Sequence, residues 1–132
     1  MKFPFSKIFK NPNKKLPVEV EKKLKNLFPM AKNLEWEQKE DIFETIFYLD
    51  DIEHIAKFSK QGEILEYKKN LWPAELPENI KKEGAKFGEI MNGIIIFRGT
   101  ELFYEMIIRN EKLDRYEFLY DQNGTLISSA LL

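Results

Sequence analysis

The sequence repeats itself once, and this repeat constrains the fold more than any other feature. Three short motifs of the first half recur in the same order in the second half, 60 to 62 residues further along the chain. The matching pairs are Leu16-Pro17 with Leu76-Pro77, residues 43–47 with 104–108, and residues 58–64 with 120–126. A unit of about 60 residues buries little surface when it folds alone. We therefore expect the two halves, at about 16–70 and 76–132, to pair their sheets and form one domain.

Each half has the pattern of one helix followed by an antiparallel meander. Apolar residues recur at helical spacing from Leu16 to Phe28 and, more weakly, from Leu76 to Phe87. Alternating apolar and polar residues then predict strands, and turns such as Asn123-Gly124 predict hairpins. The expected strands cover residues 33–39, 42–49, 52–59, 63–69, 89–97, 101–109, 113–120 and 125–131. The sequence thus predicts an α+β protein in which two tandem repeats form one sheet with helices on one face.

The first 15 residues precede this pattern and are expected to form a loosely ordered tail, which leaves residues 16–132 as the single domain. Their basic and aromatic residues leave open a contact with an anionic membrane or a partner. Pro4, Ser6 and Lys7 interrupt the apolar residues, so the segment lacks the continuous apolar stretch of a secretory signal. We expect a cytoplasmic protein as the sequence stands, or a periplasmic or extracellular one if a leader has been removed.

Composition excludes several classes of function. The 132 residues include 21 Lys and Arg against 22 Asp and Glu, whereas proteins that bind nucleic acid through its phosphates are rich in basic residues. There is no Cys and only one His, which excludes disulfide scaffolds, thiol nucleophiles and metal sites rich in Cys or His. No apolar run is long enough to cross a bilayer. We therefore expect no nucleic-acid partner, no transmembrane segment, no metal and no cofactor.

Several short motifs resemble a known bacterial family. They are Leu16-Pro17, the stretch Phe28-Pro29-Met30-Ala31, the strand Leu34-Glu35-Trp36, the strand at 43–47, and the turns at 58–62 and 120–124. In this order they resemble the PepSY-like, β-lactamase-inhibitor-like (BLIP-like) domains, over residues 16–131. The resemblance implies the fold expected above and a protein-binding or peptidase-inhibitory role, and it supplies no catalytic residues. Members of this family are mostly exported with a signal peptide or lipobox, which this sequence does not show.

The candidate chemical groups do not form an enzyme motif. His54 follows Asp50, Asp51 and Glu53, an arrangement that suggests a metal ligand or a general base. Neighbouring strand residues point to opposite faces, so Glu53 and His54 cannot meet at one ion, and a structural histidine is favoured. Solvated strand faces are likewise favoured over catalytic carboxylates for the acidic cluster Glu35, Glu37, Glu40, Asp41 and Glu44. Without a nucleophile motif or a glycine-rich phosphate loop, we expect no enzymatic activity.

Aromatic residues on the predicted strands are the best lead to a function. Two helices cover one face of an antiparallel sheet and leave the other in water, so part of the aromatic set is expected on the open face. Clustered exposed Tyr and Trp side chains commonly anchor protein partners. The expected partner-binding residues are Trp36, Tyr48, Tyr104 and Tyr116. The sequence therefore favours a non-enzymatic protein-binding or inhibitor-like module, with an unidentified protein partner and an unknown oligomeric state.

Two other functions stay open at the level of sequence. One is a small-ligand-binding or hydrolytic protein with a cleft between helix and sheet, and the other is a toxin-neutralising immunity protein. A deep pocket lined by several carboxylates and His54 would favour a ligand or a substrate. A concave aromatic face without such a pocket would favour a protein partner.

Overall fold

The computed structural model describes residues 15–132, which form two compact units. The first unit extends to Lys69 and the second begins at Asn70, and one strand contains both of these residues. The predicted tail of residues 1–15 lies outside the described residues except for Lys15. Neither helix of the described chain is long and apolar enough to cross a membrane.

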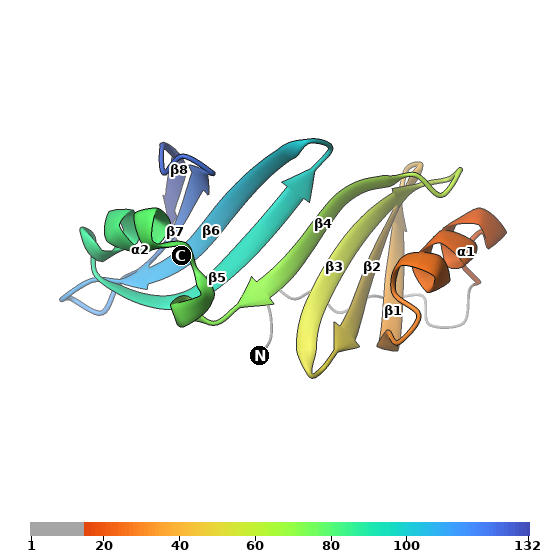
Figure 1. The fold of residues 1–132 in the computed structure, drawn as a ribbon, viewed down its shortest axis with the longest axis horizontal. Coiled ribbons are helices and arrows are strands. Elements are labelled where there is room, and N and C mark those ends of the chain that lie inside the picture. Colours follow the sequence, from red (N-terminus) through yellow and green to blue (C-terminus); the bar gives the residue numbers. More distant parts are fainter. Residues whose placement is uncertain (1–14) are drawn as a thin grey trace. The chain divides into compact units, whose positions relative to one another are not determined.

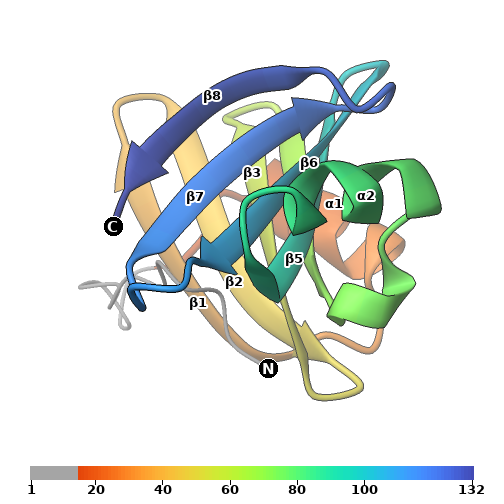
Figure 2. The same cartoon turned by 90° about the vertical axis from the view of Figure 1, so that its left-hand side faces the viewer.

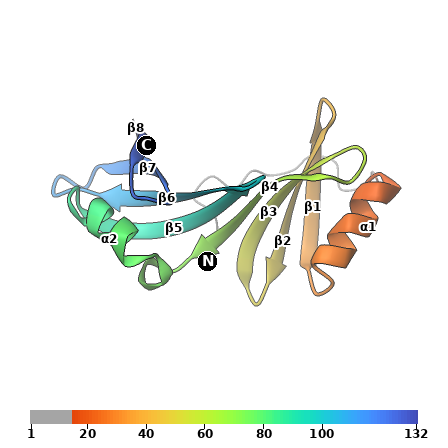
Figure 3. The same ribbon diagram turned by 45° about the horizontal axis from the view of Figure 1, so that its top comes forward.

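The first unit is a helix followed by a four-stranded meander (Figure 1). Its elements are α1 (Val18–Leu27), β1 (Lys32–Lys39), β2 (Ile42–Leu49), β3 (Ile52–Ser59) and β4 (Ile64–Leu71). Each strand is antiparallel to the next, so that Thr45 of β2 is opposite Trp36 of β1 and also opposite Ala56 of β3. Figure 3 shows α1 next to β1, the outer strand of this meander.

The helix α1 forms where the apolar stripe predicts it, and it buries that stripe against one face of the strands. The carbonyl oxygen of Pro17 accepts the N–H of Glu21 at 3.0 Å, so the helix begins directly after Pro17. Because alternate strand residues point to the same face, apolar residues two apart meet the helix together. The resulting core contains Leu16, Val20, Leu24, Trp36, Phe43, Phe47, Ala56 and Phe58.

The second unit has the same element order with one short addition. Its elements are η1 (Pro73–Glu75), α2 (Glu78–Ala85), β5 (Glu89–Arg98), β6 (Glu101–Arg109), β7 (Arg115–Asp121) and β8 (Leu126–Leu131). The strands β5 to β8 are again antiparallel to their neighbours in chain order. Figure 2 shows α2 against this meander and β8 as its outer strand beside β7. The 3₁₀ turn η1 was not predicted; the backbone N–H of Trp72 closes it by donating to the Glu75 carboxylate at 2.8 Å.

The helix α2 approaches its strands closely because glycines stand at two contact points. A Cβ atom added at Gly84 of α2 would lie 2.7 Å from Met106 Cε. One added at Gly93 of β5 would lie 3.0 Å from Leu76 Cδ2. Both distances are shorter than ordinary van der Waals contact, so a side chain at either position would require its neighbour to move. The core that results contains Leu71, Leu76, Ile80, Tyr104, Met106, Ile108, Phe118 and Tyr120.

The predicted α+β class is confirmed, with antiparallel strands and one helix in each unit. The element bounds differ from the predicted ones by a few residues at the ends. The strand β7, for example, begins at Arg115 and not at Leu113, because Leu113 has a φ of 66° and belongs to the preceding turn. The duplication of the sequence and the joining of both halves into a single domain stay predictions.

Candidate functional site

Three of the four aromatic residues predicted to bind a partner lie on the helix side of the strands. Trp36 is 8% exposed and Tyr104 is 7% exposed, and each belongs to the core under the helix of its unit. Tyr116 is half-buried and packs against the second core. The prediction that these three residues lie on the uncovered face is therefore wrong. The physical reason is that a helix buries the strand face with more apolar area, and these rings supply much of that area.

Tyr48 lies on the face away from the helix. In the pairing of β2 with β3 it is opposite Glu53, and it is one residue along the strand from the buried Phe47. Burial, together with the carboxylates of Glu53 and Glu35, raises the pKa of the Tyr48 hydroxyl. Tyr48 is half-exposed, so it is the one residue of the predicted set with the expected position. The four predicted residues thus do not form one surface.

His54 is a buried structural residue. It is 4% exposed, its ring stacks on Phe47 with centroids 5.4 Å apart, and its Nδ1 forms a 2.6 Å hydrogen bond with the Tyr67 hydroxyl. Burial and, to a smaller extent, the charge of Lys69 lower the pKa of His54 to about 4. Its ring is therefore neutral near pH 7 and belongs to an aromatic cluster. Within residues 15–132, no three His, Asp or Glu side chains come together as a metal site.

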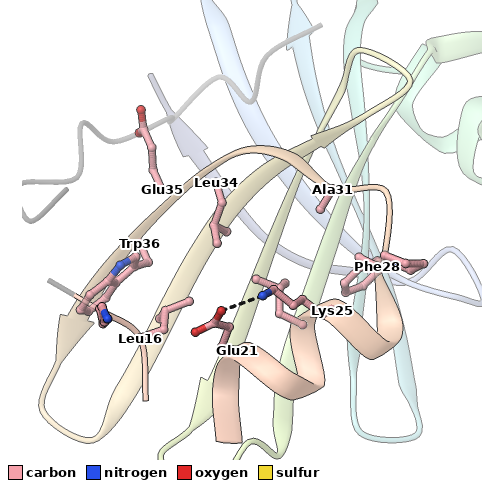
Figure 4. Close-up of a pocket in the computed structure, with 11 residues that line it drawn as sticks. Leu16, Glu21, Lys25, Phe28, Ala31, Leu34, Glu35 and Trp36 are labelled. Carbon is pink, nitrogen blue, oxygen red and sulfur yellow. Dashed lines mark hydrogen bonds and ion pairs between the residues drawn. The ribbon is translucent and has the colours of Figure 1, made fainter. Parts of the chain in front are cut away.

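A groove with a volume of about 810 Å³ lies between α1 and β1 in the first unit (Figure 4). Its lining comes from the residues just before α1, from the helix, from the loop that follows the helix, and from β1. The apolar part of the lining consists of Leu16, Leu24, Phe28, Pro29, Ala31, Leu34 and Trp36. The charged part consists of Lys15, Glu21, Lys25 and Glu35.

An irregularity in β1 accompanies the open side of this groove. Asn33 has a φ of 54°, and the register of β1 against β2 shifts between Lys32 and Glu35. Such bulges bend a strand and redirect its side chains. Figure 4 shows Leu34 and Trp36 directed toward the helix and Glu35 directed away from it. Because Leu34 is 41% exposed, the groove presents apolar surface to solvent.

One ion pair forms the rim of the groove on the helix side. Lys25 Nζ donates to Glu21 Oε1 at 2.8 Å, across one turn of α1. This hydrogen bond and the charge of Lys25, with a smaller contribution from Lys15, hold the pKa of Glu21 below its ordinary value. Both side chains are exposed, so the pair borders the groove and contributes little to stability.

The groove has the lining of a binding site. Small-molecule sites commonly measure about 300–1,000 Å³ and are mostly apolar with a few polar groups. Of its two carboxylates, Glu21 is paired with Lys25 and Glu35 points away, and His54 does not line it. The arrangement therefore favours the binding of apolar groups over acid–base chemistry. The groove itself was not predicted, and the sequence signal that could have indicated it is the apolar alternation of Leu34 and Trp36 in a strand that follows an amphipathic helix.

Solved structures from Bacteroides have a similar fold. A protein from Bacteroides eggerthii, described as a candidate periplasmic protein, has a TM-score of 0.78 at 16% identity, over 89% of this chain and 90% of that chain. A DUF2874 family protein from Bacteroides uniformis has a TM-score of 0.75 at 18% identity, over 87% and 88% of the two chains. A BLIP-like protein from Bacteroides fragilis has a TM-score of 0.74 at 16% identity, over 92% and 90%.

At these low identities the similarity concerns the fold alone. No protein-family model matches the sequence, and no curated protein matches it either. The BLIP-like neighbour agrees with the BLIP-like part of the resemblance found in the sequence. The PepSY part of that resemblance stays a prediction.

Proposed function

We propose that this protein is a non-enzymatic module that binds a protein partner, and that its α1–β1 groove accepts apolar side chains of that partner. The observation that carries the proposal is the groove itself, an apolar cavity of about 810 Å³ with Leu34 exposed in its wall. The groove lies beside the outer strand β1, whose backbone supplies additional hydrogen-bonding groups. An extended peptide gains affinity from such a strand and specificity from an adjacent pocket.

The similar folds support this class of function. The BLIP-like neighbour supports an inhibitor-like role as the specific form of the proposal. The candidate periplasmic neighbour supports a periplasmic location for this protein, reached with a leader that is later removed. We retain Tyr48 as a proposed second contact, because it is half-exposed and tyrosine is enriched where partners bind.

The proposal is tested with one substitution in the groove and one matched control. Leu34 and Ile42 are both 41% exposed, but only Leu34 lines the groove. The full chain is used to capture partners from an extract of its native organism, and the captured proteins are quantified by mass spectrometry. Leu34→Glu should weaken capture of a specific partner by more than about 2 kcal/mol, as expected for a residue at the centre of an interface. Ile42→Glu should leave that capture unchanged, and equal capture by both variants would contradict the proposal.

A small apolar ligand is the second candidate, because the volume of the groove falls within the range of small-molecule sites. The chain has two Trp residues, and Trp72→Phe leaves Trp36 in the groove wall as the sole tryptophan, whose emission can be excited selectively over that of the five Tyr residues. Titration with a long-chain fatty acid should then change the emission of Trp36 in a saturable manner if the groove holds small ligands. In the same background, Leu34→Phe would fill part of the groove and should weaken the saturable change in Trp36 emission. A flat titration combined with partner capture would favour the protein-binding function.

A further inference from the structure

The strand β8 is exposed along its whole length and carries no charge. All six residues from Leu126 to Leu131 are exposed, and residues 125–132 include no Asp, Glu, Lys or Arg. In the described part of the chain β8 pairs with β7 alone, and Figure 2 shows it as the outer strand of the second unit. Outer strands usually carry charges, prolines or bulges that prevent pairing with another chain. The strand β8 has no charge and no proline, and its register shift against β7 lies before Ser128, so the part from Ser128 onward is regular.

The outer strand of the first unit, β1, does have such features. It carries four charged residues, and its register shifts next to Asn33, which has a φ of 54°. Two copies of β1 in antiparallel register would bring like charges close together, which destabilises a strand pair. The charged residues of β1 are Lys32, Glu35, Glu37 and Lys39. Charge therefore distinguishes the two outer strands, and it leaves β8 as the strand suited to pairing.

The free side of β8 presents backbone groups in the correct alternation for a further strand. The N–H of Leu132 donates to the carbonyl oxygen of Arg115 at 2.9 Å, so the backbone of Leu132 faces β7. Backbone groups of an antiparallel strand alternate between its two sides. The N–H and C=O groups of Ser129 and Leu131 therefore face away from β7. A second antiparallel strand would satisfy them.

We propose that two copies of this protein associate through β8, with the strands antiparallel about a two-fold axis at Ser129. In this register Ser129 is opposite its own counterpart, and Ser128 is opposite Ala130 of the second copy. The segment is small in its middle and apolar at both ends, and it reads Leu126-Ile127-Ser128-Ser129-Ala130-Leu131-Leu132. A two-fold interface requires a surface that is complementary to itself, and an uncharged strand of this pattern meets that requirement. The association does not involve the groove.

Analytical ultracentrifugation of the full chain over a range of concentrations tests the proposal. A single pair of short strands buries less than the ~1,200 Å² of a standard interface, so the dimer should be weak and should increase with concentration. Ser129→Pro removes an N–H that faces away from β7, and its ring obstructs an incoming strand. We expect it to raise the dissociation constant by about tenfold or more. Ser128→Pro is the matched comparison, because it removes an N–H on the β7 side and should lower stability.

Two charged variants test the register and keep the proposal falsifiable if the proline variant does not fold. Ser129→Lys and Ser129→Glu each bring like charges together at the axis, so each should be monomeric with an unchanged unfolding midpoint. An equal mixture of the two should associate again, because opposite charges then meet. Three results would overturn the proposal: a wild-type chain that stays monomeric at every concentration, a Ser129→Pro variant that dimerises as tightly as wild type, or a mixture that stays monomeric.

Discussion

The two units pack the same element order in different ways. In the first unit α1 leaves a groove of about 810 Å³ beside β1, whereas in the second unit α2 lies in close contact with its strands. The Leu-Pro motifs are 60 residues apart, and at that spacing Leu24 of α1 corresponds to Gly84 of α2. Leu24 fills space between helix and strands, whereas at Gly84 the end of Met106 occupies the place of a side chain. The smallest residues of the contact therefore decide how near a helix can approach.

The first strands of the two meanders, β1 and β5, also differ in how closely the rest of their unit packs on them. Leu34 of β1, next to Asn33, and Gly93 of β5 occupy matching places before the two-residue turns that follow, since Lys39 pairs with Ile42 and Arg98 pairs with Glu101. At Gly93 the side chain of Leu76 comes within 3.0 Å of where a Cβ would be, so α2 is anchored to β5. At Asn33 the strand is irregular and the groove opens beside it. Two helices with similar apolar stripes therefore produce a closed contact or an open groove according to a few small positions.

The largest expected effect comes from truncating Trp36 and Tyr104, the two buried aromatic residues of the set predicted to bind a partner. Phe→Ala and Trp→Ala changes in cores cost about 3–5 kcal/mol. Tyr104→Ala should lie in the upper part of this range, because the closely packed second unit cannot relax around the cavity. Trp36→Ala should lie near its lower end, because Trp36 already borders the groove. Urea unfolding of each variant measures the free energies, and a larger loss for Trp36→Ala would contradict the difference in packing between the units.

Giving α2 the residue that α1 has at the equivalent position should be the next largest change. Gly84→Leu overfills a site where even a Cβ would lie 2.7 Å from Met106 Cε. Overpacking of this kind costs about 1–3 kcal/mol. The neighbouring Ala85 is exposed, so Ala85→Leu is the control and should be nearly neutral. The midpoint of urea unfolding distinguishes the two, and equal midpoints would show that α2 is not held close by Gly84.

The first unit should also be sensitive to acid in a way that the second is not. Folding lowers the pKa of His54 from 6.5 to about 4, so between these values the unfolded chain binds a proton that the folded chain does not. Stability is then fully present above pH 6.5, is lost as the pH falls toward 4, and is constant below that as far as His54 is concerned. The loss is on the order of 3 kcal/mol. The position of the second unit 62 residues further on is Tyr116, so this unit has no histidine at the corresponding place.

Carboxylates titrate in part of the same pH range, so the effect of His54 has to be isolated by difference. His54→Phe keeps an aromatic ring against Phe47 and removes the titrating group. Its cost in stability relative to wild type should be constant above pH 6.5 and should shrink as the pH falls toward 4, because only the wild type loses the contribution of His54. Unfolding free energies of both proteins are measured from pH 7.5 to pH 4. If the unfolding free energies of wild type and variant changed in parallel with pH, the acid sensitivity could not be assigned to His54.

The smallest predicted difference concerns two turn glycines that correspond between the units. Gly62 and Gly124 have φ values of 84° and 87°, a region that favours glycine. A Cβ at Gly62 would also lie 2.5 Å from the carbonyl oxygen of Glu19 in α1, whereas at Gly124 the nearest atom is Glu83 Cγ at 3.5 Å. Gly124→Ala should cost about 1 kcal/mol and Gly62→Ala about 2 kcal/mol. Thermal unfolding compares them directly, and equal costs would mean that α1 moves away without loss.

Much of the fold follows from local patterns that a sequence displays. The Leu-Pro starts, the apolar stripes and the alternation of the strands predict the helices and meanders, because each depends on neighbours in the chain. The partner-binding residues were predicted less well. Alternation assigns Trp36 and Tyr48 to opposite faces, since Tyr48 is one residue from Phe47, but it does not say which face a helix covers. The face that carries Phe43, Phe47 and Phe58 has the larger apolar area. The total apolar area of each face decides which one the helix covers.

By itself the sequence determined the number and order of the α-helices and strands, since propensity, periodicity and turn residues act over a few neighbouring positions. It also determined that β8 is uncharged and that β1 is charged. Only the tertiary structure decided that Trp36 and Tyr104 are core residues, that His54 meets Tyr67, and that a groove opens beside α1. These features depend on contacts between segments far apart in the chain, where close packing leaves or fills space according to the volume of each side chain.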